Sequence, residues 1–119
     1  MKILKVLTRI CINPEALTTC IAFYEGLFNE PCSLRFSYPA VRLELAQVGT
    51  VLLLAGRDVD LDPFRATRIT VMVDDIGAYQ QLFEAKGVMI IDAPKKVPTG
   101  WNMRVKHPDG LIAEYVQHA

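Results

Sequence analysis

The chain has 119 residues, of which 51% are hydrophobic and 22% charged, so it can build the core of one globular domain and is too apolar to be a disordered segment. Its 13 basic residues balance its 13 acidic ones, which gives no electrostatic reason to expect nucleic acid or an anionic membrane as a partner. No apolar run approaches the ~18 residues that a membrane helix needs.

The first half of the chain predicts a strand, a helix and three short strands. Residues 3–12 alternate between two faces, as in a strand. Asn13-Pro14-Glu15 then predicts a helix start, with an N-cap, a proline at the first helical position and an acid in the first turn. Apolar residues at helical spacing continue this helix as far as Phe28. Strands are expected next at about 33–38, 40–46 and 50–55, with Pro39 and Gly49 in the turns between them.

The second half repeats this order after a connecting loop from Gly56 to Arg65. Residues 67–73 are rich in β-branched side chains and predict a strand. Asp74-Asp75 offers an N-cap for a helix that begins at Ile76 and that Gly87 ends. Strands are expected at about 88–92, 101–106 and 111–117, with a tight turn at 107–110 between the last two.

The two halves align with each other as an internal repeat. A shift of 59 positions places Arg9 on Arg68, and near the end of each half a shift of 61 places Leu53 on Glu114. Such a repeat is a stronger fold signal than any single motif. It predicts one α+β domain over residues 1–119 that is built from two βαβββ modules. The modules are expected at about 1–57 and about 66–119, with a linker at about 58–65.

The cysteines and the N-terminus indicate where the protein works. Cys11, Cys20 and Cys32 are odd in number and lack the spacing of metal ligands, which fits reduced thiols. Lys5 and Arg9 interrupt the first apolar run, and no small-residue cleavage site follows it, so the pattern of a secretory signal fails. The expected location is therefore the cytoplasm.

Several stretches resemble the glyoxalase/bleomycin-resistance/dioxygenase family, also called the vicinal oxygen chelate family, over essentially the whole chain. The family pattern combines a first strand that bears a ligand, a helix with a Phe-Tyr pair, and a glutamate strand after an Asp-Pro-Asp-Gly-like turn. The matching stretches are Arg9-Ile10-Cys11-Ile12, Ala22-Phe23-Tyr24-Glu25, residues 67–75, residues 98–110 and Ala113-Glu114-Tyr115-Val116. The resemblance implies a curved mixed sheet around a cup, with the helices packed outside.

The resemblance also carries over four metal-ligand positions, and three of them hold unsuitable residues. Metal-dependent members bind Fe, Mn, Zn or Ni mainly through His and Glu. The corresponding residues here are Arg9, Leu53, Arg68 and Glu114. A guanidinium has no acceptor, and leucine has no lone pair. We therefore expect a cup without a metal and without another cofactor.

The cup is instead expected to bind a small organic molecule between apolar walls. Strand alternation places Leu7, Leu53 and Thr70 on its lining, together with the two arginines and Glu114. We hypothesise that Glu114 pairs with one arginine, while the other binds an anionic group of the ligand. The alternative is a structural ion-pair cluster that binds nothing.

Three further side chains have two interpretations each. Trp101 and Met103 follow Pro98-Thr99-Gly100, a stretch that could close over the cup. Trp101 could stack on a ligand or pack on a second subunit. Cys11 on the cup face could be a reactive thiol, although no histidine is placed to act as its base, and a small apolar filler is favoured.

Three functions follow, and they differ in what the cup does. The first is a metal-independent small-molecule-binding protein. The second is an enzyme of the same superfamily, a lyase, isomerase or dioxygenase, that uses Glu114 as a base or a metal ligand. The third is a regulatory or interaction domain without a ligand. In each case a homodimer is expected, because family members usually dimerise and short edge strands leave apolar surface to cover.

Overall fold

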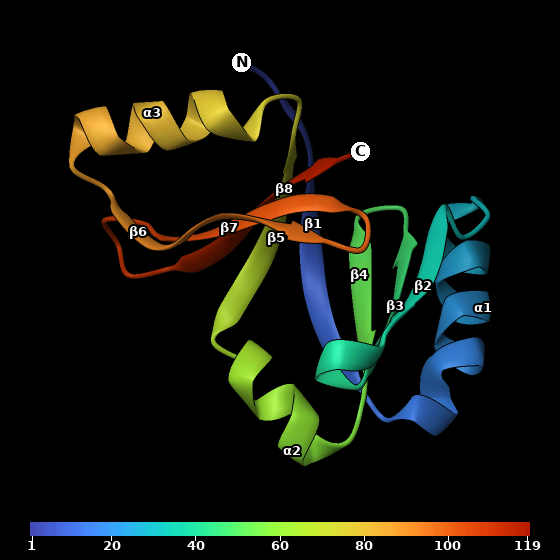
Figure 1. Cartoon of the computed structure of the whole chain (residues 1–119). Helices are drawn as coiled ribbons and strands as arrows, with labels where there is room; N and C mark the ends of the chain where they lie inside the picture. Colours follow the sequence, from blue (N-terminus) through green and yellow to red (C-terminus); the bar gives the residue numbers. More distant parts are fainter. The chain divides into compact units, whose positions relative to one another are not determined.

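The computed structural model describes all 119 residues, and the chain forms two compact units (Figure 1). The first unit is Thr8–Ala66. The second unit combines Met1–Leu7 with Thr67–Ala119. Strand β1 (Ile3–Ile12) therefore contributes to both. No helix is both long enough and apolar enough to cross a lipid bilayer.

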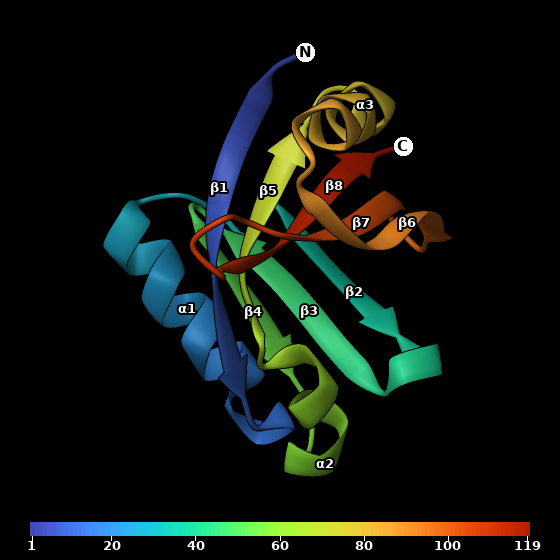
Figure 2. The ribbon, with the colours of Figure 1, turned by 90° about the vertical axis from the view of Figure 1, so that its left-hand side faces the viewer.

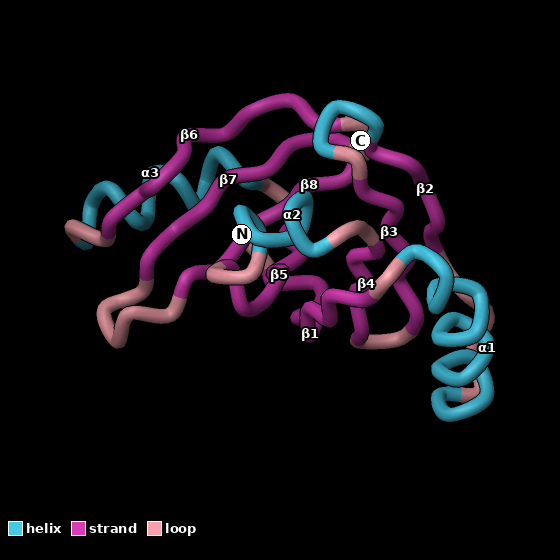
Figure 3. The backbone as a smooth tube through the Cα atoms, turned by 90° about the horizontal axis from the view of Figure 1, so that it is seen from below, coloured by secondary structure: helices cyan, strands magenta, loops and turns pink.

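The first unit contains one βαβββ module. Helix α1 covers one face of its strands, which lie side by side in the order β2-β3-β4-β1 (Figure 3). Strands β4 and β1 run parallel, and the other neighbours run antiparallel. The elements are α1 (Leu17–Phe28), β2 (Leu34–Tyr38), β3 (Leu43–Val48) and β4 (Val51–Ala55).

The second unit repeats this arrangement. Its strands follow the corresponding order β5-β8-β7-β6, and again the first and last strands of the module, β5 and β8, pair in parallel (Figure 2). The elements are β5 (Thr67–Val73), α3 (Ile76–Lys86), β6 (Met89–Val97), β7 (Gly100–Lys106) and β8 (Ile112–His118). The predicted α+β fold with two βαβββ modules and mixed strand pairing is confirmed.

Three segments differ clearly from the predictions. The strand expected from residue 40 begins only at Leu43, because Pro39–Val41 forms a 3-10 turn. The expected loop at 56–65 contains the short helix α2 (Asp58–Leu61) and a 3-10 turn at Asp62–Phe64. The charged residues of this segment led to the prediction of a loop. Leu61 is nevertheless buried, and this one apolar side chain anchors the segment. Strand β6 extends to Val97, five residues beyond its expected end at 92.

The two long helices begin differently. The Asp75 carboxylate accepts a hydrogen bond from the Ala78 N–H, which confirms the predicted N-cap of α3. Asn13 was also expected to cap a helix, but its side chain accepts no such bond, and Pro14–Ala16 forms a 3-10 turn before α1. Gly87 ends α3 with a φ of 68°, as predicted.

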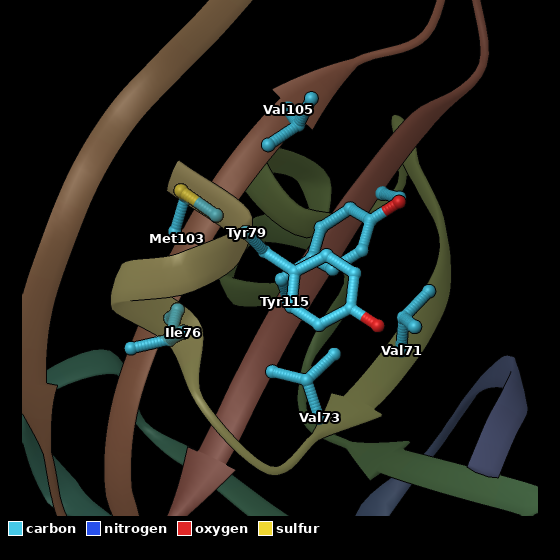
Figure 4. Packing of buried hydrophobic residues seen from close by; sticks show 8 residues of the cluster. Val71, Val73, Ile76, Tyr79, Met103, Val105 and Tyr115 are labelled. Atoms are coloured by element: carbon cyan, nitrogen blue, oxygen red, sulfur yellow. The ribbon is translucent and has the colours of Figure 1, made fainter. Parts of the chain in front are cut away.

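Each unit buries an apolar core between its helix and the facing side of its strands. In the first unit Leu17 and Ile21 of α1 pack on side chains from β3 and β4. In the second unit Ile76 and Tyr79 of α3 pack on β5, β7 and β8 (Figure 4). Full burial of each large side chain contributes about 1.5–3 kcal/mol. The strand partners are Ala46, Val48, Val51, Leu53 and Ala55 in the first core, and Val71, Val73, Met103, Val105, Ala113 and Tyr115 in the second.

Gly100, at the start of β7, has a backbone conformation in which a side chain would collide with β8. It has a φ of 149°, and a Cβ atom there would lie 2.1 Å from the backbone carbonyl oxygen of Gln117. No side chain fits into that distance. Gly100 opposes His118 in the antiparallel pairing of β7 with β8, so the glycine permits this pairing to continue to the end of both strands.

Candidate functional site

The candidate site lies on the side of the second unit's sheet that faces away from α3, which we call the helix-free face. Alternation along each strand defines it. Met103 and Val105 of β7 lie in the α3 core (Figure 4), so Asn102 and Arg104 belong to the other side. By the same alternation Tyr115 lies in the core, and its neighbour Glu114 lies on the helix-free face.

Glu114 is held in place by two neutral donors. The Thr70 hydroxyl donates to Glu114 Oε1 over 3.1 Å, and the Asn102 amide Nδ2 donates to Glu114 Oε2 over 3.1 Å. Thr70 is only 2% exposed, whereas Glu114 is half-buried. Both carboxylate oxygens therefore have defined directions, as a binding or proton-transferring carboxylate requires.

A row of polar side chains crosses four strands through Glu114. In the strand register Thr70 lies opposite Glu114, Glu114 opposite Arg104, and Arg104 opposite Asp92. Arg104 Nε donates to Asp92 Oδ2, so this arginine is engaged in an ion pair on the side away from Glu114. The row thus presents alternating charges across the helix-free face.

Arg68 lies near this row and remains available. The pairing of β5 with β8 has an irregularity between Thr67 and Ile69, which leaves Arg68 without a residue opposite it. Its side chain is exposed and makes no ion pair within the chain. Arg68 lies two positions before Thr70 along β5, so their Cα atoms are at most about 7 Å apart. The hypothesis that Glu114 pairs with one arginine therefore does not apply to Arg68, and its pairing with Arg9 stays a prediction.

Two residues that were predicted to line the cup lie instead on the helix side of the sheet. Leu53 is fully buried in the α1 core, because the parallel register places it opposite Ile10, which packs on the same core. Leu52 and Leu54 occupy the other side of β4. Met103 is likewise fully buried in the α3 core. The expected face of Leu53 was wrong by one step of the strand alternation, and Met103 lies in the α3 core instead of beside a cup.

The remaining predicted site residues have mixed surroundings. Leu7 is fully buried, and Arg9 is half-buried opposite Leu52 in β4. Trp101 is 42% exposed, with the Lys96 ammonium 5.6 Å from the centre of its ring. By alternation Trp101 shares the side of Met103, away from Glu114. Its role on a ligand or a second subunit stays a prediction.

Sequence reasoning missed Asn102, Arg104 and Asp92. A signal for the first two was present: in residues 101–106 apolar and polar side chains alternate strictly, with Trp101, Met103 and Val105 on one side. The polar set had to face away from the helix core. Asp92 could not be found in this way, because the β6–β7 register shifts on both sides of it.

The donor set does not fit a divalent metal ion. Of the four positions carried over from the family, Arg9 and Arg68 are guanidiniums, and Leu53 has no ligand atom and lies in the α1 core. No three His, Cys, Asp or Glu side chains gather closely enough to hold a metal ion. His107 lies elsewhere, with its Nε2 atom 2.8 Å from the Tyr115 hydroxyl.

Two open hollows lie in the first unit. One of about 370 Å³ is lined by Cys11, Asn13 and Arg65, among others. Arg65 forms ion pairs with Asp58 and Asp62. The other, of about 450 Å³, lies between α1 and the start of β2. Cys11 is half-buried, and the one carboxylate that lines the same hollow, Asp58, forms an ion pair with Arg65.

Among solved structures, a crystal structure of an uncharacterized protein from Methanosarcina mazei is 44% identical to this chain. The match covers 100% of this chain and 95% of that one, with a TM-score of 0.90. The chain belongs to the family of this protein.

The fold of this family is also found in known enzymes. The methylmalonyl-CoA epimerase of Mycobacterium tuberculosis is 13% identical, with a TM-score of 0.71 over 98% of this chain and 89% of that one. A Streptomyces coelicolor methylmalonyl-CoA epimerase variant, in complex with 2-nitronate-propionyl-CoA, is 18% identical, with a TM-score of 0.69 over 99% of both chains. At these identities the likeness concerns the fold, which is of the vicinal oxygen chelate type. No protein-family profile and no curated protein matches the sequence.

Proposed function

We propose that this protein is a divergent vicinal oxygen chelate protein that binds a small organic molecule with an anionic group, without a metal. The binding surface is the helix-free face of the second unit. Arg68 binds the anionic group, and Glu114 accepts a hydrogen bond from a second polar group of the ligand. The observation that carries the proposal is the Glu114 carboxylate, which Thr70 and Asn102 hold near an exposed guanidinium that forms no ion pair.

Two considerations support this proposal. The solved epimerases with this fold bind acyl-CoA compounds, as in the complex with 2-nitronate-propionyl-CoA, so the fold accommodates small organic ligands. The positions that would carry metal ligands hold arginine and leucine instead. A guanidinium binds carboxylates and phosphates in a planar, two-pronged geometry, so replacing metal ligands by arginine favours an anionic ligand.

A thermal-shift screen tests the binding. The probes are carboxylic acids, phosphate monoesters and acyl-CoA thioesters, each measured with and without a chelator. Hits should stabilise the wild type equally in both conditions. Arg68→Ala should weaken their binding at least 10-fold, whereas Arg57→Ala, which removes an exposed arginine of the first unit, should not.

Any of three results would contradict the proposal. One is that the chelator abolishes binding of every hit. Another is that no probe stabilises the wild type, and the third is that every hit binds Arg68→Ala as tightly as the wild type. Absence of any ligand would favour the regulatory domain.

A second candidate function is an isomerase in which Glu114 acts as a base. The fixed direction of both carboxylate oxygens favours it. Glu114 would take a proton from a carbon atom next to a carbonyl group, and Arg68 would stabilise the resulting enolate oxygen. The test is exchange of that proton with deuterated water for each hit of the screen. Exchange by the wild type that disappears in Glu114→Gln, with ligand binding retained, would show turnover.

A further inference from the structure

Two strands, β2 in the first unit and β6 in the second, each have one edge without a neighbouring strand, and only one of these edges is protected. Strand β6 pairs only with β7, and its register shifts twice. It also contains Pro94, Lys95 and Lys96. Bulges, prolines and lysines are the features that keep an edge strand from pairing with another chain.

Strand β2 has almost none of this protection. It pairs only with β3, in a regular register without a bulge. Its sequence, Leu34-Arg35-Phe36-Ser37-Tyr38, has no proline and a single charge. No strand other than β3 pairs with β2, and the open hollow of about 450 Å³ lies beside its first residues. An unpaired regular edge is a template for pairing with a further strand.

The side chains on the α1 side of this edge are complementary to those of a second copy. Arg35 and Ser37 share that side, because Arg35 lies opposite the core residue Ala46 and Ser37 lies opposite Glu44. Arg35, Ser37 and Glu44 are all exposed. The Ser37 hydroxyl donates to Glu44 Oε1 over 3.3 Å, so the Glu44 carboxylate leans across the small serine toward the open edge.

We propose that the protein forms a homodimer in which β2 of each copy pairs antiparallel with β2 of the other, with Phe36 at the two-fold axis. In this register Arg35 lies opposite Ser37 of the second copy. It then lies two strand spacings, roughly 10 Å, from Glu44 of that copy. An extended arginine and an extended glutamate meet across this gap, because only the serine lies between them. The symmetry forms this ion pair twice.

Charge exchange tests the interface by sedimentation velocity across a concentration series. The wild type should show a monomer–dimer equilibrium. Arg35→Glu places two carboxylates together at each contact and should weaken dimerisation by about 100-fold. The double variant Arg35→Glu/Glu44→Arg restores opposite charges and should dimerise within a few-fold of the wild type. Lys86→Glu makes the same charge change at an exposed position of α3 and should have no effect.

A second variant tests the backbone pairing without relying on the ion pair. Ser37→Arg fills the gap beside Glu44 and places a cation opposite Arg35 of the second copy, so it should also yield monomers. Circular dichroism of each variant establishes that it is folded. The proposal is overturned if the wild type is a monomer at every concentration. It is also overturned if folded Arg35→Glu and Ser37→Arg dimerise as the wild type does, because the dimer would then form elsewhere.

Discussion

The two units share one strand order and one helix position, yet their faces away from the helix differ in chemistry. In the first unit this face of β3 and β4 carries Leu45, Leu52 and Leu54, with Gln47 as its polar exception. In the second unit the corresponding strands carry Asn102, Arg104 and Glu114. The helix-side cores are apolar in both. A repeated fold thus requires only the helix side to remain apolar, and leaves the other side free to acquire a binding function.

The largest loss of stability should come from placing the residue of one unit at the aligned position of the other. Leu53→Glu introduces a carboxylate into the fully buried α1 core, where it finds neither a partner nor water. We expect a loss of about 4 kcal/mol or more in the free energy of unfolding, measured by urea denaturation. Thr50→Glu, at an exposed neighbouring position, should change stability little. A stable Leu53→Glu variant would show that Leu53 does not face α1.

The reciprocal change, Glu114→Leu, should lower the free energy of unfolding by a smaller amount. It leaves the Thr70 hydroxyl and one amide proton of Asn102 without their acceptor, for a loss of about 2 kcal/mol. Adding Thr70→Val to Glu114→Leu should cost less than the sum of the two single changes, because both variants remove the same hydrogen bond. Strict additivity in this double-mutant cycle would argue against a Thr70–Glu114 interaction.

Removing the residue before each long helix should have a smaller effect on the free energy of unfolding, and that effect should differ between the two units. Asp75→Ala removes the side-chain cap of α3 and should cost about 1 kcal/mol. Asn13→Ala, before α1, removes no cap bond and should be close to neutral. Both values come from the same denaturation assay. Equal losses for the two variants would mean that the difference between the helix starts is not energetic.

The smallest effect should be a loss of stability at alkaline pH that arises from Tyr115 in the core of the second unit. Burial raises the pKa of Tyr115 above its ordinary value of 10.0, so the unfolded chain releases this proton first as the pH rises. The associated stability is present below pH 10 and decreases as the pH rises through the pKa of the folded state. Denaturation midpoints from about pH 8 to about pH 11 should fall less in Tyr115→Phe than in the wild type. An identical pH dependence would exclude this contribution from Tyr115.

Sequence reasoning found the fold because its signals were local and repeated. Alternation marked β1, the apolar stripe marked α1, and Gly87 marked the end of α3. It misplaced Leu53 because residues 51–55 are apolar on both faces, so no alternation shows which side meets the helix. Asp92 was missed because register shifts in β6 are set by the pairing with β7. Strand alternation placed Thr70 and Glu114 on one lining, but the hydrogen bond between them was not predicted. The other donor to Glu114, Asn102, was overlooked although the alternation in β7 indicated it.

The backbone conformation at Gly100 has a consequence for how this family can evolve. With the Gln117 carbonyl oxygen 2.1 Å from the place of a side chain, even alanine would force the ends of the two strands apart. In a saturation library of the hairpin, position 100 should therefore accept glycine alone, while its exposed neighbour Pro98 should tolerate many residues. Position 100 should therefore be among the last positions of this hairpin to change.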